Sequence, residues 1–468
     1  MIRVYLDWNI ISNLKNANFI SEREFLIKNA DKISIPFSPA HFEDISKSDT
    51  PENAKLLDDI SNMCIFCSKN HLAYDKERDI AAPYIATPKQ YYEEYKQNHK
   101  TLANSFNPSY FIKTLDELCQ SGTIPSLDMP INLPELDINE SKHFKELDDV
   151  KTLKDLIFWG LNFTYNIIND KDTYITLRDT LKNYVITQTL EPTNVIPSID
   201  LILKKIGIEK CFMDIITDFH KQQKTKNSLS YFVMAYLLLD AFYKPDRLPK
   251  NSNNAINIIT DAMHAYYGAF CDYIVTDDKK FAEKTRVLFN AFDIDVPIIS
   301  SKELTNTLSP VLWKSQNDAT TDISELLVTT GLFEKNHGYK INENEDNFNW
   351  VVALDNYYLN FFNHACVYEG KDEMAGKIYV QLLRRFKSLS RYVFYSEVEK
   401  LLDLLSKTFG PIPELERRAI VNCQENAMFT WKTDDECLTI TIREDITNKG
   451  RPELDILIDT STIRITNK

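Results

Sequence analysis

The chain has 468 residues, a formal net charge of −14 and a hydrophobic fraction of 43%. The length predicts two or three domains, and the ordinary composition excludes a disordered chain. The negative charge argues against a protein that coats nucleic acid through a broadly basic surface, but a carboxylate-rich enzyme with local basic patches stays compatible with it.

The eight cysteines are scattered without the spacing of a disulfide framework, which favours a reducing, cytoplasmic compartment. Cys64 and Cys67 form a single CxxC pair, which we interpret as two buried thiols on one helical face. The most apolar stretch, 231–239, is far shorter than the ~20 residues of a membrane span. Asp7 interrupts the apolar start of the chain, so neither a membrane helix nor a signal peptide is expected.

The first fifty residues alternate between strands and helices. Residues 2–6 are predicted to form a buried strand that ends at Asp7, and a helix follows. Residues 33–37 are a second predicted strand, and Ser38 and Pro39 then start another helix. A repeated strand–helix unit indicates a parallel α/β sheet.

A long helical region is expected from about residue 53 to residue 250. Apolar residues spaced three and four apart mark helices at 89–103, 141–167, 172–188, 197–223 and 228–243. The α/β pattern then resumes with a helix over 251–268, a strand over 271–276, a helix over 279–288 and a strand over 296–299.

The last third of the chain has a different character. Helices are predicted over 351–366 and 372–407, and beyond residue 413 apolar residues alternate with period two, which indicates an antiparallel sheet with one solvated face. The expected architecture is a three-layer α/β/α domain around a central parallel sheet, with a helical insertion and a C-terminal α+β domain. Its divisions are 1–75 and 246–302 for the two parts of the α/β domain, 76–245 for the insertion and 303–468 for the C-terminal domain.

Acidic residues occur beside the predicted strands in four separate segments. Because ligands bind beyond the carboxyl ends of parallel strands, we expect these acids to converge at one edge of the sheet. They are Asp7 after the first strand, Glu43 and Asp44 in the helix after the second, Asp261 in the helix before the third, and Asp277 and Asp278 after the third.

Such a group of carboxylates repels itself unless a cation neutralises it. Oxygen ligands suit Mg²⁺ or Mn²⁺, which would activate a water and offset charge in the transition state. Each acid alone also has a structural interpretation. Asp277 and Asp278 are typical of a turn and a helix N-cap, Glu43 or Asp44 of an acid near a helix N-terminus, and Asp261 of a solvated helix face.

Two motifs bracket the α/β pattern. The chain opens with V-Y-L-D-W-N, an apolar strand that runs into D-x-N, and residues 261–281 contain a helical acid, a small-residue helix and a strand that ends in T-D-D-K-K-F. Together they resemble the PIN (PilT N-terminal) domain family of metal-dependent nucleases. The resemblance covers roughly residues 1–50 and 250–300, and the gap of 217 residues from Asp44 to Asp261 exceeds the two or three helices usual in the family.

The resemblance implies metal binding by Asp7, Asp261 and Asp278, with Asn9 and Thr276 as supporting polar residues.

The second acid is one of two neighbours. Glu43 matches the family by residue type and is slightly favoured, whereas Asp44 matches by the apolar Ile45 that follows it. His264 lies three residues after Asp261 on the same helical face. It either supports the acids or polarises a phosphate, or it is a core histidine with a satisfied polar partner, which is the favoured interpretation.

The resemblance also implies hydrolysis of phosphodiester bonds, most often in RNA, by a water that Mg²⁺ or Mn²⁺ activates. The first hypothesis is therefore an endoribonuclease of a toxin or defence type, whose target the additional domains or a regulatory protein select. Two basic stretches are candidate nucleic-acid contacts, although cations are also favoured in the last turn of a helix. Their residues are Lys221, Lys224, Lys226, Arg384, Arg385, Lys387 and Arg391.

Two alternatives stay open. A catalytically inactive PIN-like scaffold would bind RNA or a protein partner, although an acid at all four positions counts against it. A haloacid-dehalogenase-like phosphatase also uses a strand-end aspartate in an α/β fold. It requires D-x-D where this chain has Asn9, and no convincing lysine motif lies between the acids.

Overall fold

The structure is a computed structural model of the chain. It describes residues 1–47, 54–67, 69–103, 186–205, 210–222, 227–243, 255–312, 338–344, 347–369, 377–385, 388–390, 393–422, 424–432, 438–444 and 452–459. The helix expected at 141–167 and most of the one at 172–188 lie outside these residues.

Four short parallel strands form the central sheet in the order β2-β1-β5-β6. They are β1 (Ile2–Leu6), β2 (Ile33–Ser34), β5 (Tyr273–Val275) and β6 (Ile298–Ile299). All five residues of β1 are buried, as expected for a strand covered on both faces of a parallel sheet. The expected α/β class with a parallel sheet is confirmed.

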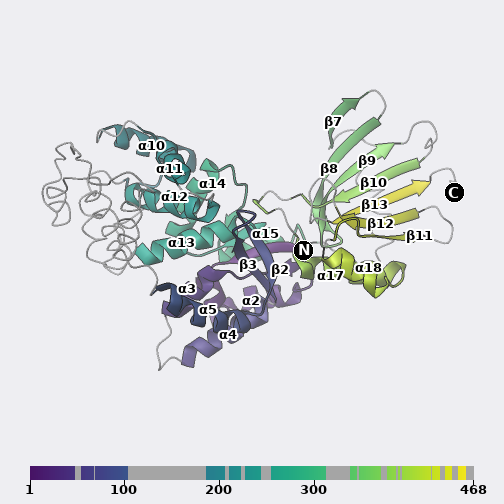
Figure 1. Cartoon of the computed structure of the whole chain (residues 1–468), viewed down its shortest axis with the longest axis horizontal. Coiled ribbons are helices and arrows are strands. Elements are labelled where there is room, and N and C mark those ends of the chain that lie inside the picture. Colours follow the sequence, from purple (N-terminus) through teal and green to yellow (C-terminus); the bar gives the residue numbers. More distant parts are fainter. Residues whose placement is uncertain are drawn as a thin grey trace, which may run out of the picture.

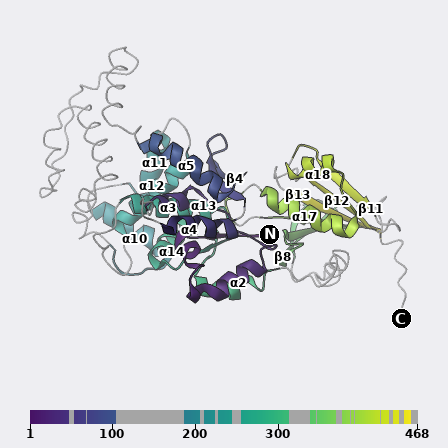
Figure 2. The same ribbon diagram turned by 90° about the horizontal axis from the view of Figure 1, so that it is seen from below.

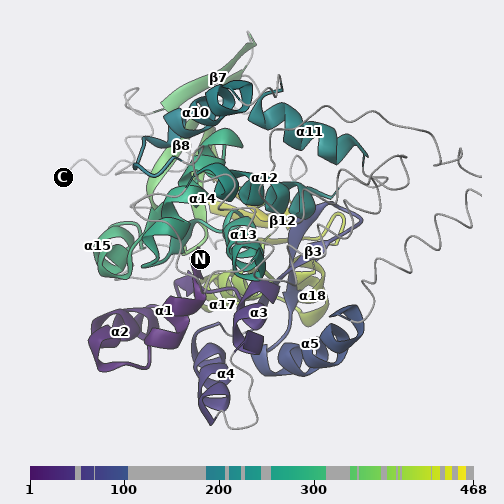
Figure 3. The same cartoon turned by 90° about the vertical axis from the view of Figure 1, so that its left-hand side faces the viewer.

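Helices cover both faces of this sheet (Figures 1 and 3). Because side chains alternate along a strand, Tyr5 faces one apolar cluster while Val4 and Leu6 face the other. The Tyr5 side holds α10 (Pro192–Lys205), α11 (Phe212–Gln222), α12 (Ser228–Phe242), α13 (Ala255–Gly268) and α14 (Lys279–Ala291). The opposite side holds α1 (Trp8–Asn13), α2 (Ile20–Lys28), α3 (Pro39–Lys47), α4 (Ala54–Phe66), α5 (Pro88–Ala103) and α15 (Leu304–Leu308).

The described part of the insertion belongs to the same core. Helix α12 packs against α13 and α14, and its apolar side chains join the cluster that contains Tyr5. A hairpin of β3 (Asn70–Asp75) and β4 (Ile80–Ile85) precedes α5, so the expected division at residue 75 falls inside it. At the hairpin turn, Asp79 accepts a hydrogen bond from the backbone of Ser228 at the start of α12. The hairpin thus anchors the insertion to the α/β domain.

Helix α13 approaches the sheet closely at its last residue. A Cβ on Gly268 would overlap the side chain of Ile274 in β5 and lie 3.5 Å from the ring of Tyr5. The glycine therefore allows α13 to rest directly on β1 and β5, which brings Asp261 and His264 towards the strand ends.

The C-terminal region is a seven-stranded antiparallel sheet with helices α17 (Tyr395–Phe409) and α18 (Glu414–Val421) packed on it (Figures 1 and 2). The strand order is β11-β12-β13-β10-β9-β8-β7. The strands are β7 (Gly338–Asn344), β8 (Asn347–Tyr358), β9 (Phe362–Glu369), β10 (Lys377–Leu383), β11 (Met428–Lys432), β12 (Leu438–Glu444) and β13 (Pro452–Asp459).

Two helix predictions in this region are wrong. Residues 351–366 form parts of β8 and β9, and within 372–407 only α17 is helical because β10 occupies the earlier part. The β8–β9 turn places Leu359 and Asn360 at positive φ, a conformation that the sequence does not announce with a glycine. The turn without a glycine therefore concealed a hairpin.

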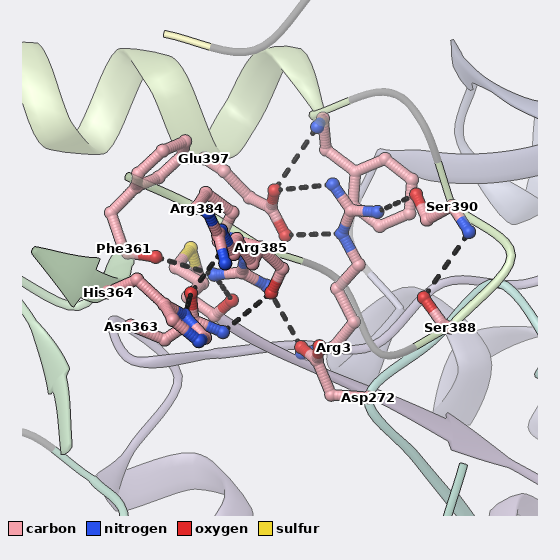
Figure 4. Close-up of polar contacts among 12 residues, drawn as sticks. Arg3, Asp272, Phe361, Asn363, His364, Arg384, Arg385, Ser388, Ser390 and Glu397 are labelled. Atoms are coloured by element: carbon pink, nitrogen blue, oxygen red, sulfur yellow. Dashed lines mark hydrogen bonds and ion pairs between the residues drawn. The ribbon is translucent and has the colours of Figure 1, made fainter. Parts of the chain in front are cut away.

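The two regions meet at the N-terminal ends of β1 and β5 (Figures 2 and 4). Arg3 binds Glu397 of α17 through two hydrogen bonds of 2.9 Å, and Arg384 binds Asp272 at 2.9 Å. Asp272 also accepts from the backbone nitrogen of Arg3 at 2.7 Å, which joins the two pairs. Burial alone would raise the pKa of Glu397, but the charge and hydrogen bonds of Arg3 outweigh it and lower that pKa to about 2.

No helix among the described residues is long and apolar enough to cross a membrane. Of the CxxC pair, Cys67 is buried as expected, but Cys64 is exposed, and both are free thiols.

Candidate active site

Strands β1 and β5 end side by side, and the polar residues that follow them meet. The backbone nitrogen of Asp7 donates to the carbonyl of Val275 at 3.0 Å. Thr276 Oγ1 donates to Asp7 Oδ2 at 3.0 Å and accepts from the backbone nitrogen of Asp278 at 3.1 Å. Asn9 Nδ2 approaches Asp7 Oδ2 at 3.5 Å, a longer and weaker contact. One hydroxyl, that of Thr276, thus couples the first acid to the last.

The two adjacent aspartates face different partners. Both carboxylate oxygens of Asp277 accept hydrogen bonds from Ser301, at 2.7–3.0 Å. Asp278 is the N-cap of α14, where its Oδ1 accepts from the backbone nitrogens of Lys280 and Phe281. Its Oδ2 accepts no hydrogen bond from the residues that the structure describes. Asp277 therefore binds the segment after β6. Asp278 caps α14 through Oδ1, and its Oδ2 has no described hydrogen-bond donor.

On α3 the structure brings Asp44, not Glu43, to the other acids. Asp44 Oδ2 lies 2.9 Å from His264 Nε2, and its charge contributes to the raised pKa of Asp7. Glu43 points to α5, where its carboxylate accepts a hydrogen bond from the hydroxyl of Tyr95. One residue along a helix rotates the side chain by about 100°, which separates these neighbours.

His264 is 2% exposed and both ring nitrogens have partners. Nε2 lies against Asp44, and Nδ1 lies 2.8 Å from the hydroxyl of Tyr5. Burial lowers the pKa of His264, but the hydrogen bond to Asp44 and the charges of Asp44, Asp7 and Asp261 outweigh it and raise the pKa. His264 is therefore a buried histidine whose two ring nitrogens both have partners, one of which is an acid of α3.

The hydrogen bonds continue beneath the acids from Tyr5 to Ser38 Oγ, at 2.7 Å, and to His41. His41 Nε2 donates to the carbonyl of Leu6 at 2.9 Å, and the backbone nitrogen of Ser38 donates to Nδ1 at 3.1 Å. Burial lowers the pKa of His41 to about 3, so its ring is neutral. This series of hydrogen bonds connects the start of α3 to the end of β1. The sequence analysis missed its members, although the alternation along β1 already set Tyr5 apart from Val4 and Leu6.

Asp261 is half-buried on α13, and no described residue donates a hydrogen bond to it. Burial raises its pKa, the charge of Lys284 offsets part of this rise, and the charges of Asp7 and Asp278 add to it. The resulting pKa is about 7. Asp261 thus experiences the other acids directly, and the described cations do not neutralise it fully.

A buried ion pair lies behind Asp261. Lys284 Nζ binds Asp240 Oδ1, and their side chains are 10% and 6% exposed. Lys284 shares the apolar stripe of α14 with Phe281 and Leu288, and Asp240 shares that of α12 with Phe232. A charged residue in an apolar stripe is the sequence signal that would have pointed to this pair.

The described residues contain no group of three acidic, histidine or cysteine side chains arranged closely enough to hold a metal ion. Mg²⁺, however, usually keeps several waters and uses only one or two protein carboxylates together with substrate phosphates. The donor set fits such an ion, because its oxygens are hard ligands and Asp261 lacks a hydrogen-bond donor. Its one or two carboxylate ligands would come from among Asp7, Asp44, Asp261 and Asp278.

The expected nucleic-acid contact at Arg384 is wrong. Its side chain is 3% exposed and is bound to Asp272 and to the carbonyls of Met1 and Phe361, so it cannot reach a nucleic acid. Arg385 is half-buried in the same junction, away from the acids. Lys221 lies in α11 with its side chain outside the described residues. Also outside are Lys224, Lys226, Lys387 and Arg391.

Comparisons with family models, with curated proteins and with solved structures found no match to this chain.

Proposed function

We propose that the chain is a PIN-like metal-dependent nuclease that hydrolyses phosphodiester bonds, with RNA as the substrate. One observation carries the proposal, the approach of Asp7, Asp44, Asp261 and Asp278 from four separate segments to one edge of a parallel sheet. His264 and Asp44 are 220 positions apart and still form a hydrogen bond. Segments on either side of the insertion therefore meet at this edge of the sheet.

The surrounding residues hold the acids in place. Thr276 fixes the separation of Asp7 from Asp278, and His264 fixes the orientation of Asp44. Burial and the charges of the neighbouring carboxylates raise the pKa of Asp7 and of Asp261, and a bound cation would favour their ionised forms. When bound, Mg²⁺ or Mn²⁺ would activate a water for attack on phosphorus and offset the charge that develops there.

The phosphatase alternative is favoured by one observation, the buried Lys284 close to Asp261 and Asp278. Its charge is, however, already paired with Asp240, and position 9 remains an asparagine. The nuclease is therefore the stronger proposal, and the phosphatase and the inactive scaffold are alternative outcomes of the same experiment.

The experiment measures cleavage of a mixed cellular RNA pool by the purified chain with Mn²⁺, with Mg²⁺ and with EDTA. Asp278→Asn is expected to lower cleavage by more than about 100-fold, since even residues that only support a metal site cost 10–100-fold. Asp277→Asn is the matched control. It makes the same change one residue away, at a carboxylate bound to Ser301, and should keep activity within a factor of about three.

Cleavage that survives EDTA or Asp278→Asn would contradict the proposal. RNA binding without cleavage would favour the scaffold. Release of phosphate from a small monoester in place of RNA cleavage would favour the phosphatase.

A further inference from the structure

Tyr236 on α12 carries a hydroxyl that is buried without a hydrogen-bond partner. The side chain is 0% exposed, and its hydroxyl has no partner among the described residues. The nearby Thr285 hydroxyl donates to the carbonyl of Phe281 at 2.7 Å, and its proximity to the Tyr236 hydroxyl lowers the pKa of Tyr236 in part, without forming a hydrogen bond of ordinary length. An unsatisfied buried hydroxyl costs about 1–3 kcal/mol, so its presence on the buried face of α12 needs a reason.

The surroundings of this hydroxyl point to the acids. Asp240 lies one helical turn after Tyr236 and binds Lys284, whose Nζ is 5.7 Å from the centre of the Tyr236 ring. Lys284 in turn acts on Asp261 and Asp278, because each of these carboxylates raises its pKa. Burial and the charges of Asp261, Asp240 and Asp278 together raise the pKa of Tyr236 well above its ordinary value.

We propose that helix α12 of the insertion forms one wall of the active site, where Tyr236 is a positioning residue whose hydroxyl hydrogen-bonds the water shell of a divalent cation held by Asp261 and Asp278. This inference rests on the proposed function. It assigns the missing partner of the hydroxyl and makes the insertion part of the site. A hydrated Mg²⁺ or Mn²⁺ retains waters that need hydrogen-bond partners, and a fixed phenol supplies one.

The test compares two tyrosine-to-phenylalanine changes, each of which removes one buried hydroxyl. Tyr236→Phe removes a group without a protein partner, so the metal-free protein should keep or gain thermal stability. Its affinity for Mn²⁺, measured by calorimetric titration, should fall about tenfold. Tyr266→Phe is the matched control on the adjacent helix α13. There the hydroxyl is 2.8 Å from Ser228 Oγ, so thermal stability should fall while Mn²⁺ affinity stays unchanged.

Two results would overturn the inference. One is wild-type Mn²⁺ affinity in Tyr236→Phe, and the other is a loss of metal-free stability in that variant, which would reveal a structural partner. Mn²⁺ titrations of the wild type and of Asp278→Asn distinguish a failure of this inference from a failure of the proposed function. If the wild type binds Mn²⁺ and Asp278→Asn does not, an unchanged Tyr236→Phe removes only the role of Tyr236. If the wild type binds no Mn²⁺, both fail.

Discussion

Two charged clusters lie at opposite ends of the same two strands. At the N-terminal ends of β1 and β5, Arg3 pairs with Glu397 and Arg384 pairs with Asp272, so positive and negative charges balance (Figure 4). At the C-terminal ends, carboxylates gather, and Asp261 finds no hydrogen-bond donor among the described residues.

The two clusters differ in charge balance, and this difference distinguishes a structural cluster from a candidate binding site. A buried charge that has its counter-ion and its hydrogen bonds holds elements together, and here it attaches the C-terminal region to the α/β domain. Buried carboxylates with incomplete neutralisation instead destabilise the fold until a cation binds. The junction also lies at the sheet edge away from the acids, so its contacts do not cover them.

The largest effect is expected from breaking the balanced cluster. Glu397→Gln leaves the Arg3 guanidinium buried without its counter-ion, and the free energy of unfolding in urea should fall by about 3–5 kcal/mol. The control is Glu414→Gln, which removes the carboxylate of an exposed pair with Arg418 on α18 and should change it by less than about 0.5 kcal/mol. Equal effects of the two changes would show that the junction is not the structural cluster described above.

An intermediate effect is expected from the two neighbouring acids of α3. Asp44→Asn should lower Mn²⁺ affinity and RNA cleavage by about 10–100-fold, because it removes the negative charge that lies beside Asp7 and His264. Glu43→Gln should change both by less than about threefold, since Glu43 contacts Tyr95 instead. Parallel metal titrations and cleavage assays of the two variants decide the matter, and the reverse ranking would refute the assignment of Asp44.

The smallest effect concerns how the free energy of unfolding depends on pH. Asp261 and Glu397 should contribute to this dependence with opposite signs, and the measurement is made in EDTA to keep the protein free of metal. Asp261 has a folded-state pKa of about 7 against an ordinary value of 3.8, so between these pH values only the folded state binds the proton. Its contribution to the free energy of unfolding therefore falls as pH rises. Between pH 5.5 and 7.5 the wild type should lose about 2 kcal/mol relative to Asp261→Asn.

Glu397 has the opposite sign. Its folded-state pKa of about 2 lies below the ordinary 4.5, so its stabilisation is present above pH 4.5 and is lost as pH falls towards 2. Urea titrations of the wild type, Asp261→Asn and Glu397→Gln across pH 2.5–7.5 measure how the free energy of unfolding changes with pH in each range. A wild-type curve parallel to that of Asp261→Asn between pH 5.5 and 7.5 would contradict the unbalanced cluster.

The local sequence pattern was sufficient to predict elements whose apolar residues recur with a clear strand or helix period. The strand over 2–6, the strand over 271–276 and the helix over 279–288 correspond to β1, β5 and α14 within a few residues. It failed at β8 and β9, where a long apolar and aromatic run suits a helix as well as a buried hairpin, and the positive φ of Leu359 and Asn360 left no glycine as a signal.

The sequence by itself determined which acids follow the strands, because a strand end, its turn and its helix cap are local events. Thus Asp7 and Asp278 could be named in advance. Only the tertiary structure decided that Asp44 approaches His264 while Glu43 turns away, that Asp277 binds Ser301, and that Arg384 is buried. These outcomes depend on helix rotation and on partners up to hundreds of positions away, and no local pattern encodes either.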